Sequence, residues 1–170
     1  GKCLSCGSWG TLKEFREPAA RAQAQRQGLT EPTTGVVSLD SCTDADISRI
    51  PSPFGDVDRV LGGGLVQGAA ILLGGDPGIG KSTLLLQLCT GWIDQDKTCL
   101  YVSGEESPRQ LFLRASRLSL DPARISVLAE TSVETILAQC EQFHPDVLII
   151  DSIQTLWSEE LQSAPGSVSQ

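Results

Sequence analysis

Apolar residues from Ile50 onward follow two patterns that alternate along the chain. Short apolar runs such as "AAILL" and "VLII", bounded by glycine or polar residues, are typical of buried strands. Between these runs, apolar residues recur at the spacing of amphipathic helices. We expect strands at residues 69–75, 98–103, 125–129 and 146–150. We expect helices at residues 81–93, at 107–118 and from 132 up to Pro145, which stops the last one.

This alternation of strands and helices predicts an α/β fold. Strands that are separated by helices favour a mostly parallel sheet with helices packed on it. The functional site of such a fold lies at the carboxyl ends of its strands. Polar residues that directly follow the expected strands are therefore the first candidates for chemistry.

The helix expected from Ser132 has the clearest local signals. Thr131 and Glu134 have the spacing of a capping box, which marks the start of a helix. The apolar residues that repeat along one face of this helix are Val133, Ile136, Leu137 and Cys140.

The composition divides the chain into three parts. Residues 1–16 carry cysteine, glycine and tryptophan, and we expect them to form a small compact unit. Residues 17–48 are rich in Ala, Gln, Pro, Thr and Ser with little apolar periodicity, which indicates a linker. Residues 49–170 have the pattern of a packed domain. Because the chain contains no methionine and stops in a polar stretch, we expect it to be part of a longer protein.

Size and charge exclude several classes of protein. With 170 residues, 40% of them hydrophobic, the chain suffices for one α/β domain and a small appendage. A formal charge of −8, with seven acidic residues and no Lys or Arg beyond Arg124, argues against a simple nucleic-acid coat. No apolar run approaches the roughly 20 residues that span a bilayer, and the start of the chain lacks a secretory signal pattern. We therefore expect a cytoplasmic protein without a membrane partner.

The stretch "GGDPGIGKST" has the spacing of a phosphate-binding loop, with Gly75, four residues, Gly80, Lys81 and Ser82. It lies between an expected strand and an expected helix, which favours this interpretation over a glycine-rich turn without a ligand. Glycines let successive backbone N–H groups point at phosphate oxygens, at the positive end of the helix dipole. We expect Lys81 to reach the β- and γ-phosphates of ATP, and the Ser82 hydroxyl to ligate Mg²⁺. The expected nucleotide-binding residues are Gly75, Asp76, Pro77, Gly78, Ile79, Gly80, Lys81, Ser82 and Thr83.

Acidic residues follow two of the expected strands. Asp151 comes directly after "VLII", so a buried strand delivers its carboxylate to the edge where the phosphates and Mg²⁺ are expected. Glu105 and Glu106 follow "TCLYVS" at the same edge, where one carboxylate is expected to orient and deprotonate the attacking water. Spacing does not decide between them, and both are also ordinary as solvated charges at the start of a helix. Further candidates for contact with the γ-phosphate or the water are Gln154 and Thr155.

Cys3 and Cys6 form a Cys-x-x-Cys knuckle, which is half of a four-cysteine zinc ribbon. We expect a Zn²⁺ half-site with its partner cysteines absent, because no βαβ pattern surrounds the knuckle as a redox motif requires. The other cysteines are scattered singly, so a disulfide framework is not expected. Cys89, Cys99 and Cys140 fall within helix or strand patterns and are expected to pack as small hydrophobic residues.

Together these motifs resemble the RadA (Sms) family of bacterial DNA repair proteins, which have a RecA-like ATPase core. "GKCLSCGSWGTLKE" is similar to the second half of the amino-terminal zinc finger of that family. "GGDPGIGKSTLLLQ", "YVSGEESPRQLFLRA" and "LIIDSIQT" are similar to its ATPase core. The resemblance covers nearly the whole chain except the linker. It implies a RecA-like P-loop NTPase core, incomplete in this sequence, preceded by half of a small zinc ribbon.

The resemblance also implies an activity, namely DNA-dependent ATP hydrolysis in recombinational repair together with RecA recombinase. Such a protein would be a helicase-like, ring-shaped homo-hexamer that drives branch migration on single-stranded and branched DNA, with Zn²⁺ in its intact form. By position, the resemblance implies catalytic roles for Lys81, Glu105 and Glu106, of which Glu105 is the closer match to the RecA-like glutamate. It implies that Asp151 organises Mg²⁺. Two alternatives stay open: a KaiC-like signalling ATPase or autokinase, and a module that binds nucleotide without turnover.

Overall fold

The computed structural model describes residues 48–159, which all lie in one compact unit spanning Thr43–Gln170. The expected zinc half-site at residues 1–16, with Cys3 and Cys6, lies outside the described residues, as does the linker up to residue 47. None of the helices between residues 48 and 159 has the length and apolar character needed to cross a membrane.

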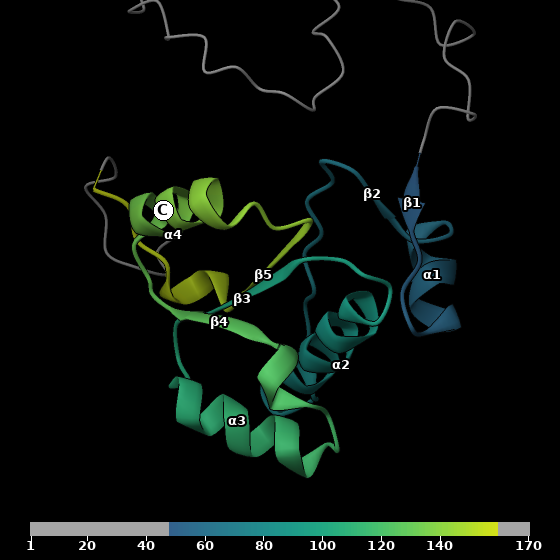
Figure 1. Ribbon diagram of the computed structural model, residues 1–170, viewed down its shortest axis with the longest axis horizontal. Helices are drawn as coiled ribbons and strands as arrows, with labels where there is room; N and C mark the ends of the chain where they lie inside the picture. The colour runs from purple at the N-terminus through teal and green to yellow at the C-terminus, as the bar shows by residue number, and fades with distance from the viewer. Residues whose placement is uncertain (1–47, 160–170) are drawn as a thin grey trace, which may run out of the picture. The chain divides into compact units, whose positions relative to one another are not determined.

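A three-stranded parallel sheet forms the centre of this unit (Figure 1). Its strands are β3 (Cys99–Ser103), β4 (Ser126–Ala129) and β5 (Val147–Asp151), in the order β4-β3-β5. Every residue of β3 is buried, which explains why its sequence is a continuous apolar run rather than an alternation. Ser103 lies opposite both Ala129 and Asp151, so the three strands end at the same level. The predicted α/β class with a parallel sheet is confirmed.

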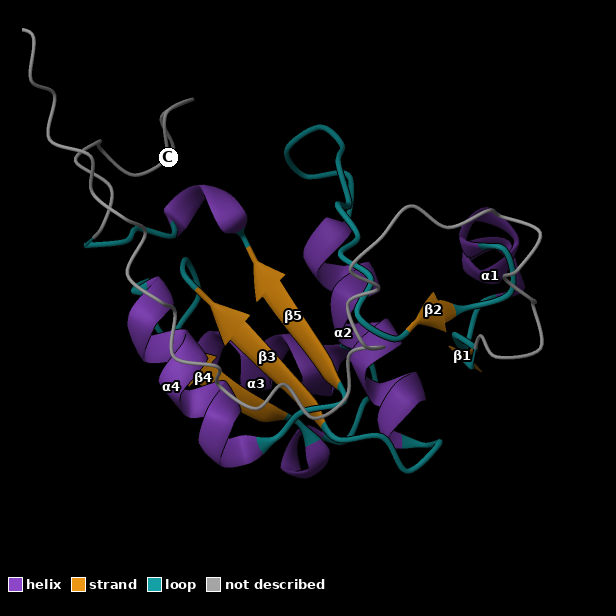
Figure 2. Ribbon diagram, turned by 90° about the horizontal axis from the view of Figure 1, so that it is seen from above, coloured by secondary structure: helices purple, strands orange, loops and turns teal. Residues whose placement is uncertain are grey.

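Helices cover both faces of the sheet (Figures 1 and 2). α2 (Lys81–Ile93) and α3 (Pro108–Arg117) lie on one face, and α4 (Val133–Phe143) lies on the other. Successive β3 residues belong to opposite core clusters, as the pleat of a strand requires. The larger cluster, on the α2 face, contains Leu86, Leu88, Cys89, Trp92, Cys99, Tyr101, Leu111, Val147 and Ile149. The smaller cluster, on the α4 face, contains Leu100, Val102 and Ile136.

The strand predicted at residues 69–75 does not form, so this prediction is wrong. The run has no strand pairing, and Ile71, Leu72 and Leu73 are 51%, 81% and 40% exposed. A strand is stable only when a neighbour takes up its backbone N–H and C=O groups. Within the described residues this run pairs with no strand, and β5, at one edge of the sheet, pairs only with β3. The pattern of a strand carries no information about the neighbour that the strand needs.

A short antiparallel strand pair and a helix precede this run. Their bounds are β1 (Arg49–Ile50), α1 (Gly55–Leu61) and β2 (Leu65–Val66). The Trp92 indole N–H donates to the carbonyl of Pro51 at 3.0 Å, which joins this segment to α2. Pro53 packs against Gly91 so closely that a Cβ at this glycine would lie 2.3 Å from Pro53 Cγ. The glycine inside α2 is therefore explained by close packing, because glycine is otherwise unfavourable in a helix.

Ser132, rather than Thr131, caps the start of α4. The Ser132 hydroxyl accepts the N–H of Thr135 at 3.3 Å. The Thr131 hydroxyl instead accepts the indole N–H of Trp157 at 3.2 Å. The capping box predicted between Thr131 and Glu134 is therefore wrong, because a distant tryptophan occupies the expected capping group. The helix ends at Phe143, before Pro145, as predicted.

The apolar face predicted for α4 is buried only in part. Ile136 is 3% exposed, whereas Leu137 is 56% exposed and Cys140 is only partly covered. Cys89 and Cys99 are buried, as predicted for cysteines that pack as hydrophobic residues. The spacing of apolar residues therefore predicted the position of the helix correctly, but it overestimated how many of these residues are buried.

Candidate functional site

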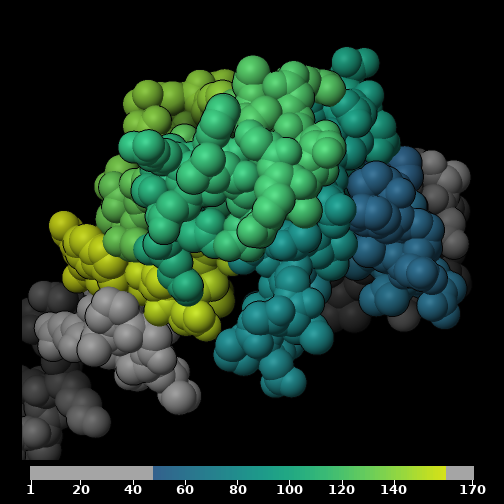
Figure 3. All heavy atoms as spheres, turned by 90° about the horizontal axis from the view of Figure 1, so that it is seen from below, coloured from purple at the N-terminus to yellow at the C-terminus, as the bar shows by residue number. Residues whose placement is uncertain are grey.

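The glycine-rich loop leads directly into α2. Residues 74–80 are exposed, and Figure 3 shows this segment, in teal, projecting from the surface. Gly78 and Gly80 have φ angles of 81° and 110°, which residues with a side chain rarely adopt. A Cβ on either glycine would meet nothing within 4 Å, so glycine is required here by conformation rather than by space. The helix begins at Lys81, as predicted.

The amino end of α2 is open to an anion. Gly80 occupies the N-cap position, and no side chain among the described residues caps the helix. The first N–H groups of a helix have no partner inside the helix, and they carry the positive end of its dipole. Combined with the curled loop, these groups form the kind of site that binds phosphate. The loop before α2 and the first turn of this helix therefore have the features of a phosphate-binding site.

Lys81 lies folded back on the loop. Its ammonium donates to the carbonyls of Gly75 at 2.7 Å and Asp76 at 3.0 Å. A phosphate bound in the loop would compete with these carbonyls for the same ammonium group. Ser82 follows in the first turn of α2 and is partly buried. Both side chains expected to contact the phosphates or their metal ion thus start from the helix end beside the loop.

Asp151 lies on the face of the sheet that α2 covers. Alternate residues of a strand point to the same face, and Val147 and Ile149 pack in the cluster under α2. Asp151 continues this series at the end of β5. Figure 2 shows β3 and β5 ending on the side of the molecule from which the loop before α2 projects. The end of β5 thus lies on the face covered by α2, and the loop that precedes α2 projects on the side where β3 and β5 end.

Tyr101 contacts Asp151 in a way that the sequence did not predict. The Tyr101 hydroxyl donates to Asp151 Oδ2 at 2.7 Å, and the tyrosine is 0% exposed. Burial raises the pKa of Tyr101, and the hydrogen bond to Asp151 and the charges of Asp151 and Glu106 raise it further. The phenol therefore stays protonated and acts as the donor. The sequence did contain one signal for this contact, which is the single tyrosine within the apolar run of β3. A buried phenol needs a polar partner, so a hydrogen bond from this residue could have been expected.

Glu105 lies against the segment that follows β5. Its Oε1 accepts the Ser152 hydroxyl proton at 2.8 Å and an N–H of the Gln154 side-chain amide at 3.3 Å. Because Ser152 directly follows Asp151, these bonds place the Glu105 carboxylate beside the end of β5. The side chain is exposed, so water has access to it.

Glu106 turns toward α3 instead. Arg114 Nε donates to one carboxylate oxygen at 3.2 Å, and Arg114 Nη2 makes a close contact with the other. The side chains of Arg114 and Glu106 are 28% and 23% exposed, so this ion pair is largely shielded from water. The two glutamates, which spacing left equivalent, therefore have different partners and different access to solvent.

Gly104 lets the turn after β3 approach the segment after β5. Its N–H donates to the carbonyl of Asp151 at 3.0 Å. A Cβ on Gly104 would lie 1.8 Å from Thr155 Oγ1, so any larger residue would push this contact apart. Thr155 ends the 3₁₀ helix η4 (Ile153–Thr155), and its hydroxyl donates to the Ser152 carbonyl at 2.7 Å. The Thr155 hydroxyl thus stabilises the turn after β5, whereas the side-chain amide of Gln154 donates to Glu105.

A polar hollow of about 290 Å³ lies at the carboxyl ends of β3 and β4, lined by residues 103–107 and 129–131. Glu130 lies at this hollow. Its carboxylate accepts the backbone N–H of Ser132 at 3.0 Å and that of Thr131 at 2.7 Å. These two bonds hold the pKa of Glu130 below its ordinary value of 4.5. Glu130 thus orders the turn between β4 and α4.

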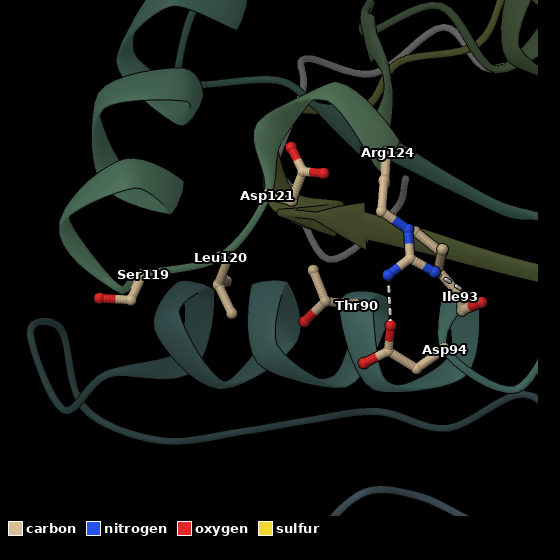
Figure 4. Close-up of a pocket in the computed structure, with 7 residues that line it drawn as sticks. All are labelled: Thr90, Ile93, Asp94, Ser119, Leu120, Asp121 and Arg124. Atoms are coloured by element: carbon tan, nitrogen blue, oxygen red, sulfur yellow. Dashed lines mark hydrogen bonds and ion pairs between the residues drawn. The ribbon is translucent and has the colours of Figure 1, made fainter.

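A second hollow, of about 140 Å³, lies at the far end of α2 from the loop (Figure 4). Here Arg124, the last residue of the 3₁₀ helix η3 (Pro122–Arg124), forms an ion pair with Asp94 and donates to the carbonyl of Ile93 at 3.2 Å. The residues that line it are Thr90, Ile93, Asp94, Ser119, Leu120, Asp121 and Arg124. Its position at the carboxyl end of α2 separates it from the phosphate-binding loop.

The side chains present fit a magnesium ion that is bound together with a nucleotide. Mg²⁺ in such sites is held by one or two protein oxygens, by water and by phosphate oxygens. The Ser82 hydroxyl and the Asp151 carboxylate supply protein oxygens of this kind. Between residues 48 and 159, no group of three or more His, Cys, Asp or Glu side chains is arranged to hold a metal ion. Magnesium here would therefore depend on the phosphates for the rest of its ligands.

Comparison with known proteins defines the class of this site. The family model described as "ATPase: KaiC" matches residues 33–128. The match includes the glycine-rich loop, Lys81 and both glutamates, and it covers more than half of the chain. The chain therefore belongs to this family of ATPases, which fits the RecA-like core inferred from the motifs.

Along its whole length the chain is similar to proteins named DNA repair protein RadA. It is 47% identical over 171 residues to that of Pseudomonas aeruginosa, 43% over 175 to that of Escherichia coli and 41% over 174 to that of Bacillus subtilis. Each alignment covers 100% of this chain but only 37% or 38% of the relative, so the chain spans little more than a third of their length. The resemblance to the RadA family is confirmed.

Proposed function

We propose that this chain contains the ATP-hydrolysing site of a DNA repair motor. The observation that carries the proposal is the position of Glu105, which is hydrogen-bonded to the segment following Asp151 and exposed to water. Glu106 is instead engaged by Arg114. An exposed carboxylate beside a second carboxylate, at the edge of the sheet that carries the phosphate loop, has the position of a general base.

In this proposal, residues 75–83 bind the phosphates of ATP. The N–H groups of the loop and of the first turn of α2 donate to phosphate oxygens. Lys81 exchanges its two carbonyl partners for the β- and γ-phosphates, while Ser82 and Asp151 hold Mg²⁺. When bound, Mg²⁺ neutralises part of the negative charge on the phosphates.

Glu105 would take a proton from the water that attacks the γ-phosphorus. The new bond joins the water oxygen to phosphorus, and the bond that breaks joins this phosphorus to the oxygen bridging the β- and γ-phosphates. The products are ADP and inorganic phosphate, and the proton passes from Glu105 to bulk water. Ser152 and Gln154 act here by orienting the carboxylate toward the reacting water.

The relatives support the biological setting of the proposal. Because they carry the name DNA repair protein RadA, we assign the hydrolysis to DNA repair rather than to KaiC-like signalling. The family resemblance further supports a cytoplasmic homo-hexamer on single-stranded or branched DNA that acts with RecA recombinase. It also supports Zn²⁺ binding through Cys3, Cys6 and further cysteines. The acidic stretch beyond Arg124 contains no Lys or Arg, so the DNA contacts must come from other residues.

Two neighbouring substitutions test the assignment of Glu105. ATP hydrolysis and ATP binding are measured in the intact protein with Mg²⁺ and single-stranded DNA, for Glu105→Gln and for the matched control Glu106→Gln. We expect Glu105→Gln to lower kcat by about 100- to 10,000-fold, the usual contribution of a general base, while ATP binding is retained. We expect Glu106→Gln to lower stability through loss of its ion pair and to leave kcat within a few-fold.

Two other outcomes contradict the proposal. A large loss of kcat in Glu106→Gln with normal turnover in Glu105→Gln would assign the general base to the other glutamate. ATP binding without Mg²⁺-dependent turnover in the unsubstituted protein would indicate a nucleotide-gated module instead of an enzyme.

A further inference from the structure

The hydrogen bond from Tyr101 to Asp151 links the core of the sheet to the edge that carries the site. Tyr101 lies in the middle of β3, and its ring packs in the cluster that α2 covers. The register pairs Tyr101 with Ile149, and Asp151 with Ser103. The phenol therefore reaches diagonally along one face of the sheet to place its hydroxyl 2.7 Å from Asp151 Oδ2.

Asp151 is held at one oxygen and open at the other. Oδ2 accepts the Tyr101 hydroxyl proton, and among residues 48–159 no donor is bonded to Oδ1. Asp151 is only partly buried, and Oδ1 is the oxygen that the bond to Tyr101 leaves without a donor among these residues. A hydrogen bond to one oxygen of a metal-binding carboxylate fixes its orientation, and such supporting partners commonly tune metal affinity.

We propose that Tyr101 is a positioning residue for magnesium, whose hydroxyl holds the Asp151 carboxylate so that Oδ1 stays directed to the metal ion or to its water shell. This inference rests on the ATP site proposed above. If Tyr101 only filled the core, its replacement by phenylalanine would cost some stability but would leave magnesium binding unchanged, because the ring is kept. The proposed role needs the hydroxyl, and this difference makes it testable.

The test measures how strongly Mg²⁺ promotes nucleotide binding. The affinity of the intact protein for the non-hydrolysable analogue AMP-PNP is determined by titration calorimetry, once with Mg²⁺ and once with EDTA. In Tyr101→Phe we expect the factor by which Mg²⁺ tightens binding to fall by about 10-fold, with the affinity in EDTA unchanged. A folded Tyr101→Phe protein with the full Mg²⁺ effect overturns the proposal.

Cys99→Ala is the matched control for a general disturbance of the core. Cys99 is buried in the same strand and in the same cluster as Tyr101. We expect Cys99→Ala to lower the thermal midpoint and to leave the Mg²⁺ effect unchanged. If this variant weakens the Mg²⁺ effect as much as Tyr101→Phe does, the hydroxyl has no specific role and the proposal is overturned.

A double substitution tests whether Tyr101 acts through Asp151. In an Asp151→Asn background, Tyr101→Phe should cause no further loss of the Mg²⁺ effect, because the carboxylate to be positioned is already gone. A further loss of the same size in this background overturns the proposal. The comparison also holds when Tyr101→Phe lowers stability, because the substitution is introduced into both backgrounds and a general effect of lost stability would appear in both.

The failure of the ATP site itself gives a separate result. If Mg²⁺ does not tighten AMP-PNP binding in the unsubstituted protein, the proposed function is contradicted, and the role of Tyr101 falls with it. If Mg²⁺ acts equally in the unsubstituted and Tyr101→Phe proteins, only the role of Tyr101 is overturned.

Discussion

Arg114 on α3 holds the carboxylate of Glu106 through both Nε and Nη2, whereas the carboxylate of the adjacent Glu105 is bonded to Ser152 and Gln154 after β5. The pair is largely shielded from water, so removal of the guanidinium leaves a partly buried carboxylate without its partner. We predict that Arg114→Ala lowers the free energy of unfolding by about 1–3 kcal/mol. Urea denaturation measures this loss.

The matched comparison for this ion pair is a double-mutant cycle with Glu106→Gln. The two single substitutions should each destabilise the protein, and the double substitution should cost less than their sum. Strictly additive losses would show that the two side chains do not interact in solution. Arg114→Lys keeps the charge but not the two-point contact, and should lie between Arg114→Ala and the unsubstituted protein.

Gly91 provides a second prediction, in which packing opposes helix propensity. Alanine in a helix is favoured over glycine by about 1 kcal/mol. A Cβ at this position would nevertheless lie 2.3 Å from Pro53 Cγ, so the segment around Pro53 must move. We predict that Gly91→Ala lowers the thermal midpoint, with a net cost of about 1–3 kcal/mol.

Gly55 serves as the control for this substitution. A Cβ on Gly55, in the first turn of α1, would meet nothing within 4 Å. Gly55→Ala is therefore expected to be neutral or slightly stabilising. Combining Gly91→Ala with Pro53→Gly should recover part of the loss, since the clashing ring is removed. No recovery, or a stabilising Gly91→Ala, would contradict the packing described here.

The lowered pKa of Glu130 leads us to predict that the stability of the protein depends on pH. Its carboxylate accepts the backbone N–H groups of Ser132 and Thr131, and its pKa in the folded protein lies below the ordinary value of 4.5. A lowered folded pKa means that the ionised carboxylate stabilises the fold above about pH 4.5, and that this contribution is lost as the pH falls through the lowered pKa. Glu130→Gln should therefore lower the thermal midpoint at pH 7, and the difference from the unsubstituted protein should shrink on acidification.

The control for this pH effect is Glu141→Gln, at an exposed position of α4. Thermal midpoints of all three proteins are compared between about pH 3 and pH 7. A gap between Glu130→Gln and the unsubstituted protein that stays constant over this range would contradict the role assigned to its ionised form.

The sequence predicted those parts of the fold that depend on local pattern. The start of α2 at Lys81 follows from the glycine-rich loop, and the parallel sheet follows from the alternation of apolar runs and helices. The predicted strand at residues 69–75 failed because a strand needs a neighbour, which its own pattern does not encode. The capping box predicted for α4 was wrong because the Thr131 hydroxyl accepts a hydrogen bond from Trp157, which lies far along the chain.

The candidate site shows the same limit. Spacing brought Glu105, Glu106 and Asp151 to one edge of the sheet, but it left the two glutamates equivalent. Arg114 and Ser152, eight and 47 residues away from their partners, distinguish them. The contact between Tyr101 and Asp151 likewise joins residues 50 positions apart in sequence. Such contacts follow from the strand register, which apolar runs alone do not specify.

The most direct test of the central claim is the rate of Mg²⁺-dependent ATP hydrolysis by the intact protein with and without Lys81. The claim is that the loop before α2 binds the phosphates and that this ammonium group stabilises the charge that develops on them. We predict that Lys81→Ala lowers the hydrolysis rate by about 100-fold or more, with the fold retained, because a charge-stabilising donor is removed. A rate equal to that of the unsubstituted protein would contradict the account.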